Sequence, residues 1–147
     1  MRTGTRLAVD VGTVRIGVAK SDALGLLASP LTTVARDDAA VARLAALAAE
    51  WGAIEVYVGL PRALSGRTTA STEDAMGFAR ELAAAWDGPV RFVDERLSTV
   101  TAADRLHETG RDARRQRTVI DQVAATIILE AALDSERRTG NQPGSRV

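Results

Sequence analysis

The amino-acid sequence predicts an α/β fold in which helices pack on the faces of a five-stranded mixed β-sheet. Three strand patterns open the chain, and helix and strand patterns alternate after them. A hairpin-led start followed by alternating elements is typical of a mixed sheet covered by helices. With 147 residues, the chain has the length of one compact domain, which we place at residues 1–138.

The first three strands are expected to form an antiparallel unit. Residues 6–11 and 15–20 are rich in Val, Ile and Ala, and Gly12-Thr13 between them predicts a tight hairpin turn. Residues 26–34 predict the third strand, and Pro30 favours a place at the sheet edge because proline cannot donate to a strand ladder.

Two helices then alternate with two strands. The first helix begins at Asp37-Asp38 and ends near Gly52, and residues 54–58 form the fourth strand. The second helix follows the loop at residues 65–67, and residues 90–93 form a short fifth strand. The apolar residues at helical spacing are Val41, Leu44, Ala45 and Ala48 in the first helix and Ala75, Phe78, Ala79, Leu82 and Trp86 in the second.

The last third of the chain predicts two helices and a tail. A short helix runs from a cap at Ser98 to Gly110, and residues 111–117 form a polar, basic loop. The final helix begins at about Thr118 and ends at Arg137. Residues 139–147 contain Gly, Asn, Pro and Ser and predict a disordered tail.

Composition excludes several classes of protein. There is no cysteine, so disulfides and thiolate metal sites are ruled out. No apolar run approaches the ~20 residues that a bilayer span requires, and no signal-peptide core follows Arg2 and Arg6. The 19 basic and 19 acidic side chains balance, which argues against coating nucleic acid by charge alone. We therefore expect a cytoplasmic protein with no membrane partner.

Acidic side chains occupy three places where chemistry is plausible. Asp10 lies inside an apolar strand, Asp94-Glu95 ends another strand, and Asp121 lies in the first turn of the last helix. Carboxylates that converge repel one another, and Mg²⁺ or Mn²⁺ relieves that repulsion while providing hydrolytic chemistry. Alternation along the strand sends Asp94 and Glu95 to opposite faces, and spacing alone does not choose between them.

Each acid also has a structural interpretation. Asp10 can cap the following turn, Glu95 can pair with Arg96, and Asp121 can favour the helix N-terminus. For Asp121 alone the structural interpretation is the better one, whereas an aspartate in mid-strand is harder to explain without a function. His107, the only histidine, is expected to interact with the C-terminal end of its helix and not to act as a base.

Arginines accompany these acids, and Arg suits bidentate phosphate recognition. Four lie near strand ends or loops on the side of the acids, and three more precede Asp121 in a basic stretch whose alternative is a solvated loop. They are Arg15, Arg62, Arg67 and Arg96, and then Arg114, Arg115 and Arg117.

Four motifs in a fixed order resemble the YqgF/RuvX family, bacterial relatives of the Holliday junction resolvase RuvC. They are DVGTVRIGVAKSD (10–22), GLP (59–61) with Gly66, DERLST (94–99) and IDQVAA (120–125). The resemblance covers residues 6–133. It implies a ribonuclease H-like fold and carries over Asp10, Glu95 and Asp121 as metal-binding carboxylates, which settles the choice between Asp94 and Glu95.

The resemblance implies a nuclease that matures the 5′ end of 16S ribosomal RNA or, in an alternative description, resolves four-way DNA junctions. Two ions, Mg²⁺ or Mn²⁺, would be held with Asp10 bridging them. RuvC-type sites carry four acids, and here Asp94 or Asp22 is a candidate for the fourth. The arginines from residue 62 to 67 and Arg96 are implied near the substrate.

The sequence leaves the substrate, the oligomeric state and the kind of activity open. The substrate is structured RNA or a DNA junction, with ribosomal particles as further partners, and the protein acts as a monomer or a homodimer. A non-catalytic nucleic-acid-binding module is a third interpretation, although a pure binder gains nothing from acids that repel phosphate. The segment from Asp10 to Thr13 also resembles a phosphate-binding loop of actin-like ATPases, but those enzymes need two lobes.

Overall fold

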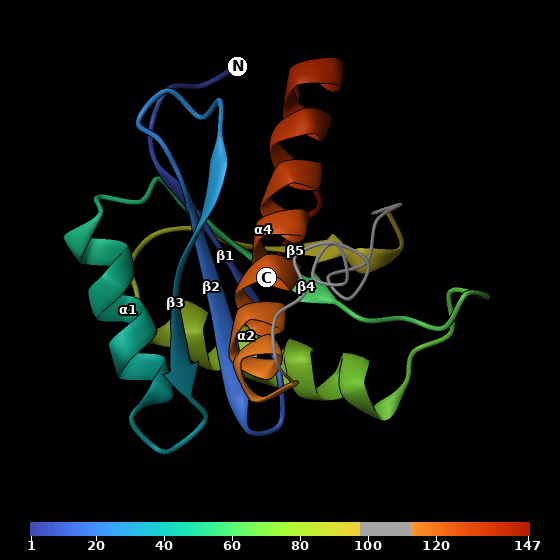
Figure 1. The fold of residues 1–147 in the computed structure, drawn as a ribbon. Helices are drawn as coiled ribbons and strands as arrows, with labels where there is room; N and C mark the ends of the chain where they lie inside the picture. The colour runs from blue at the N-terminus through green and yellow to red at the C-terminus, as the bar shows by residue number, and fades with distance from the viewer. Residues whose placement is uncertain (98–112) are drawn as a thin grey trace.

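The computed structural model describes the backbone of residues 1–97 and 113–147 and the side chains of residues 1–96 and 119–147. Within these ranges a six-stranded mixed sheet carries helices on both faces (Figure 1). The elements are β1 (Arg6–Val11), β2 (Arg15–Ser21), β3 (Ala28–Ala35), α1 (Ala40–Glu50), β4 (Glu55–Leu60), α2 (Ala70–Ala85), β5 (Val90–Asp94), the 3₁₀ helix η1 (Glu95–Leu97), α4 (Ala113–Thr139) and β6 (Ser145–Arg146).

The strands lie in the order β3-β2-β1-β4-β5-β6. β1, β2 and β3 form the expected antiparallel unit, and β1 pairs in parallel with β4, which pairs in parallel with β5. Because β1, β4 and β5 run in the same direction, their carboxyl ends reach the same edge of the sheet. That edge collects the residues that follow each strand.

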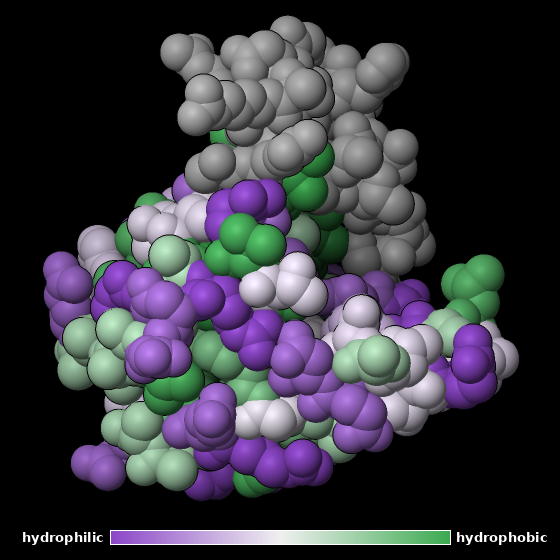
Figure 2. Space-filling model, turned by 90° about the horizontal axis from the view of Figure 1, so that it is seen from below, coloured by the Kyte–Doolittle hydropathy of each residue, from purple (hydrophilic) through white to green (hydrophobic). Residues whose placement is uncertain are grey.

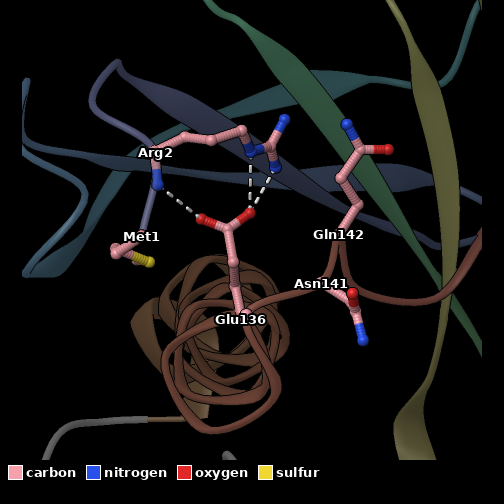
Figure 3. Close-up of a pocket in the computed structure, with 6 residues that line it drawn as sticks. Met1, Arg2, Glu136, Asn141 and Gln142 are labelled. Atoms are coloured by element: carbon pink, nitrogen blue, oxygen red, sulfur yellow. Dashed lines mark hydrogen bonds and ion pairs between the residues drawn. The ribbon is translucent and has the colours of Figure 1, made fainter.

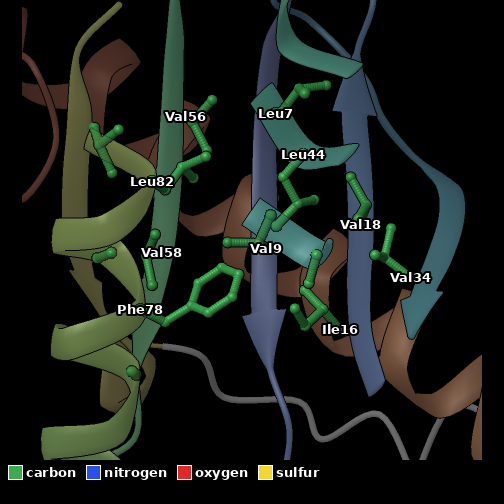
Figure 4. Packing of buried hydrophobic residues seen from close by; sticks show 14 of the residues in the cluster. Leu7, Val9, Ile16, Val18, Val34, Leu44, Val56, Val58, Phe78 and Leu82 are labelled. Carbon is green, nitrogen blue, oxygen red and sulfur yellow. The ribbon is translucent and has the colours of Figure 1, made fainter. Parts of the chain in front are cut away.

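Alternation of side chains divides the core into two layers. Leu7 and Val9 of β1 face α1 and α2, whereas Ala8 between them faces α4. The larger layer contains branched aliphatic side chains from the sheet and Leu44, Phe78 and Leu82 from the two helices (Figure 4). The α4 layer includes the small sheet residues Ala8 and Ala19, which let this helix approach β1 and β2 closely.

The final helix begins earlier than the sequence pattern indicated. α4 starts at Ala113, so Arg114, Arg115 and Arg117 lie on a helix and not in a loop. Ala, Arg and Gln are strong helix formers, and this propensity outweighs the polar character that suggested a loop. Their side chains and the expected helix at residues 98–110 lie outside the described residues. No helix in the described part of the chain is long and apolar enough to cross a membrane.

The last residues form a strand where the sequence indicated a disordered tail. β6 pairs antiparallel with β5, and the Val147 amide donates to the Val90 carbonyl at 2.9 Å. The Arg91 side chain donates to the carbonyls of Pro143 at 2.6 Å and Gly144 at 2.9 Å. The open edge of β5 offers unpaired backbone groups, and satisfying them outweighs the flexible composition of the segment. This strand accounts for the sixth member of the sheet.

A buried ionic cluster joins the N-terminus to α4. The Arg6 side chain is 0% exposed, and its Nη2 donates to Glu136 Oε2 at 2.6 Å. Arg2 donates from Nε to Glu136 Oε1 at 2.9 Å (Figure 3) and from Nη2 to Glu55 Oε1 at 2.8 Å. Burial, followed by the negative charge of Glu55, raises the pKa of the neighbouring Tyr57 hydroxyl. The cluster fixes β1, β4 and α4 to one another at the amino ends of these strands.

We expect Glu136→Ala to lower the free energy of unfolding by about 3–5 kcal/mol, because it leaves Arg6 buried without a carboxylate partner. Urea denaturation measures the change. Asp134→Ala on the same helix is the matched control, because its pair with Arg138 is exposed and such pairs contribute about 0–1 kcal/mol. Equal effects of the two substitutions would contradict the role of the cluster.

Candidate metal-binding active site

Asp10 is placed by the alternation of β1. Its neighbour Val9 points into the α1 and α2 layer, so Asp10 points to the other face, where α4 packs. In the antiparallel ladder with β2, Asp10 lies opposite Gly17. The aspartate is half-buried at the end of an otherwise apolar strand. This position brings its carboxylate to the edge where the parallel strands end.

Glu95 reaches the same place from β5. It is the first residue of η1, directly after the strand, and its carboxyl group forms a hydrogen bond with that of Asp10. Gly59 of β4 makes room for it, since a Cβ at Gly59 would lie 2.8 Å from Glu95 Oε1. The structure therefore brings Asp10 and Glu95 together.

Asp121 comes from α4 on the face above β2. A Cβ built at Gly17 would lie 1.8 Å from the Asp121 carbonyl oxygen, so the helix backbone rests directly on the strand at this glycine. Because Gly17 is the ladder partner of Asp10, this contact sets Asp121 near Asp10. Gln122 adds a side-chain hydrogen bond of 3.0 Å to Thr33 of β3.

Burial and mutual repulsion raise the pKa values of two of the three acids, Asp10 and Glu95. Burial and then the charge of Asp10 raise the pKa of Glu95 to about 8. Burial raises the pKa of Asp10 as well; the hydrogen bond with Glu95 opposes this change and the charge of Asp121 adds to it. A hydrogen bond between the two carboxyl groups requires one proton, so this pair is neutralised in part by protonation.

Asp121 is neutralised differently, by Arg15. The Arg15 Nε atom donates to Asp121 Oδ2 at 2.7 Å, and the two side chains are 37% and 17% exposed. The sequence predicts Arg15 at the substrate, and in this structure its guanidinium binds an acid of the site. Arg15 and a metal cation would therefore compete for the Asp121 carboxylate.

The donor atoms of the three acids fit a hard divalent cation, although the three carboxylates are not close enough together in this structure to bind one. Asp10, Glu95 and Asp121 offer only oxygen donors from half-buried side chains, which is the chemistry that Mg²⁺ and Mn²⁺ prefer. Among the described residues, no three His, Cys, Asp or Glu side chains are close enough together to hold a metal ion. Asp121 pairs with Arg15, which agrees with the distance between its carboxylate and the other two acids.

The two candidates for a fourth acid have other partners, although the charge of Asp94 also raises the pKa of its neighbour Glu95. Asp94 binds Arg96 through Oδ2 to Nη2 at 2.6 Å and has Arg62 Nε at 3.9 Å. Asp22 follows β2, which runs opposite to β1, and accepts the Leu26 amide at 2.7 Å in the β2–β3 turn. Neither acid contacts Asp10 or Glu95 in the described hydrogen bonds and ion pairs.

Arg36 is a supporting residue that the sequence did not single out. It donates to the Gly12 carbonyl at 2.8 Å and makes two bonds of 2.9 Å to Asp74 of α2. Its guanidinium carbon also lies 5.0 Å from the centre of the Phe78 ring. Arg36 thus ties the turn between Asp10 and Arg15 to α2. An arginine next to Asp37-Asp38 carries no local signal for this long-range contact.

The described arginines expected at the substrate lie in different parts of the fold, with Arg15 at Asp121 and both Arg62 and Arg96 at Asp94. Arg62 and Arg67 lie in the loop between β4 and α2, and Arg96 follows Glu95. Figure 2 views the side on which β1 ends and α4 begins, and the coloured surface there is mostly hydrophilic to neutral.

Comparison with known proteins gives a consistent assignment. Residues 4–135 match the RuvX family model, described as a Holliday junction resolvase. Proteins of Clavibacter michiganensis subsp. michiganensis and Streptomyces coelicolor, each named "Putative pre-16S rRNA nuclease", are 59% and 51% identical to this chain. The matches span 100% of this chain and 93% and 90% of those proteins.

Solved structures extend the likeness to the fold. Thermus thermophilus RuvC in complex with a Holliday junction substrate superposes with a TM-score of 0.60 at 14% identity, over 98% of this chain and 99% of that one. At this identity the likeness concerns the fold alone. It confirms the ribonuclease H-like α/β fold expected from the sequence.

We expect Gly17→Ala to destabilise the protein and to weaken Mn²⁺ binding, because the added methyl group would displace α4 and Asp121. Thermal unfolding and calorimetry with Mn²⁺ measure the two effects. Gly77→Ala in α2 is the control: its Cβ meets no atom within 4 Å, and we expect a gain of about 0.5–1 kcal/mol. A Gly17 variant as stable as the Gly77 variant would disprove the close contact.

The raised pKa of Glu95 predicts how stability depends on pH in EDTA. A carboxyl group whose pKa rises from 4.5 to about 8 on folding resists ionisation in the folded state. Its contribution to stability is complete below its unfolded pKa and disappears as pH rises to the folded value. Denaturant unfolding should therefore show a loss of stability between about pH 5 and pH 8. Glu95→Gln should flatten this profile, and Glu50→Gln at the exposed end of α1 should not.

Proposed function

The chain belongs to the RuvX family, and on that premise we propose that it is a divalent-metal-dependent nuclease that matures the 5′ end of precursor 16S ribosomal RNA. The observation that carries the proposal is the contact between the carboxyl groups of Asp10 and Glu95, with Asp121 near enough to raise the pKa of Asp10. Folding gains nothing from repelling acids, whereas a nuclease that binds cations requires them.

Asp10, Glu95 and Asp121 would hold two divalent ions, Mg²⁺ or Mn²⁺. When bound, such ions supply an activated water and stabilise the leaving oxygen of a phosphodiester. The protein provides a rigid frame for this chemistry, since Asp10 lies in the sheet and Asp121 is fixed by the contact at Gly17. Glu95 gives up its proton when a cation takes that place.

Arginines would orient the phosphates and take no part as acids or bases. Arg62 and Arg96 lie at Asp94, the residue before Glu95, and Arg67 belongs to the same loop as Arg62. Arg15 binds Asp121 in this structure, and it would be free to bind a phosphate if Asp121 held a cation. We assign the same phosphate-binding part to the basic residues at the start of α4, which are Arg114, Arg115 and Arg117. A ribosomal RNA substrate places the enzyme in the cytoplasm, with ribosomal particles as partners.

Resolution of four-way DNA junctions is the second candidate, because the family model carries that description. Cutting a junction symmetrically needs two sites, and hence a homodimer, whereas RNA maturation can proceed in a monomer. A binding module without catalysis is the third candidate and predicts that the acids can be neutralised without loss of function.

We expect the purified protein to cut a single-stranded precursor ribosomal RNA fragment faster than a four-way DNA junction, in Mg²⁺ or Mn²⁺ and not in EDTA. Asp10→Asn should reduce the rate at least about 10²-fold, because it removes a charged ligand of the proposed metal site. Gel analysis of end-labelled substrates measures both rates. Faster cutting of the junction would favour the resolvase, and a fully active Asp10→Asn variant would refute metal-dependent catalysis at this site.

A further inference from the structure

The carboxylate of Asp94 is surrounded by arginine donors. Its Oδ1 accepts the Arg96 backbone amide at 2.9 Å and Arg96 Nε at 3.1 Å, and its Oδ2 accepts Nε at 3.0 Å and Nη2 at 2.6 Å. Arg62 Nε lies 3.9 Å from the same Oδ2. Both carboxylate oxygens are therefore committed to these side chains, and the next residue, Glu95, turns to Asp10.

The loop between β4 and α2 brings Arg62 to this carboxylate. Its chain turns at Gly66, where φ is +86° and the amide donates to the Ala63 carbonyl at 2.8 Å. Arg62 Nη1 donates back to the Gly66 carbonyl at 3.3 Å. At the far end, the Thr72 hydroxyl donates to the Pro61 carbonyl, which ties the start of the loop to α2. The loop is thus built to hold Arg62 over Asp94.

Part of the Arg96 guanidinium has no hydrogen-bond partner among the residues that the structure describes. Arg96 binds Asp94 along its Nε and Nη2 edge, and its Nη1 group has no hydrogen-bond partner among the described side chains. Gly66 lies beside Nη1, because a Cβ there would be 3.0 Å away. One carboxylate and two guanidinium groups leave a net charge of +1, next to the acids that would cut a phosphodiester. Free N–H groups on a fixed guanidinium suit an anionic oxygen.

We propose that Asp94 is a positioning residue that orients Arg62 and Arg96 to bind a nucleic-acid phosphate adjoining the one that is cut, and that it is not a fourth metal ligand. The inference rests on the proposed nuclease function, which it deepens by assigning the residues that hold the substrate backbone. Arg67, exposed on the same loop, extends the positive surface away from the acids.

The test compares Asp94→Asn with wild type in three measurements. Asparagine keeps the hydrogen bond to the Arg96 amide, so η1 and Glu95 should stay in place. We expect KM for RNA to rise about tenfold with kcat changed less than about threefold, and RNA affinity measured by fluorescence anisotropy in EDTA to fall by a similar factor. Mn²⁺ affinity measured by calorimetry on the protein alone should be unchanged.

Further variants separate positioning from general effects. Asp134→Asn removes the same charge from an exposed aspartate–arginine pair about 20 Å along α4 from Asp121 and should leave RNA binding at the wild-type level. Asp94→Glu should recover part of the affinity. Because Asp94 acts through both arginines, adding Asp94→Asn to the double variant Arg62→Ala/Arg96→Ala should not weaken RNA binding further, and a further loss would contradict the proposal.

Each contrary result has a distinct meaning. A tenfold loss of Mn²⁺ affinity in Asp94→Asn would make Asp94 a metal ligand and overturn the proposal. Unchanged RNA affinity in that variant would overturn it too, whether or not the protein cuts RNA. If wild type binds RNA in EDTA but cuts nothing in Mn²⁺, the proposed nuclease function fails while the anisotropy measurement still decides the role of Asp94.

Discussion

The contact between the backbone of α4 and β2 at Gly17 is the constraint on which the site depends. Among the described helices, α4 covers one face of the sheet, and small residues such as Ala8 and Ala19 let it approach. Because Gly17 is also the ladder partner of Asp10, the same contact that closes the core sets the third acid beside the first. One close approach thus contributes both to the packing of α4 and to the position of Asp121.

The negative charges of the acids at the site are compensated by different neighbouring groups. Burial raises the pKa of Asp10 and Glu95, which lie against each other, whereas Asp121 binds Arg15 and Asp94 binds Arg96. Under the proposed function, a cation would replace the first two arrangements and a phosphate would bind near the third. Because the acids are half-buried at the strand ends, exchanging one charged partner for another would change the free energy substantially, since charge interactions are stronger away from bulk water.

The sequence predicted what depends on local pattern and failed where distant partners decide. A mid-strand aspartate identified Asp10, and the strand and helix periods predicted most of the core. Glu95 and Asp94 could not be separated by spacing, because the direction of Glu95 is set by the turn of η1 after the strand. Gly17 and the ordered end of the chain escaped detection because their partners, α4 and β5, lie far away in sequence.

The buried ionic cluster at the other end of the strands has a consequence for how the chain folds during synthesis. Arg6 emerges early from the ribosome, and its carboxylate partner in the described structure, Glu136, is made 130 residues later. In a nascent chain lacking α4 the Arg6 guanidinium has no Glu136 to bind, so we expect burial of Arg6 in the sheet to be unfavourable until nearly the whole chain has been translated. Commitment to the native sheet is in this way deferred to the end of translation, when the helix that carries Asp121 is also available.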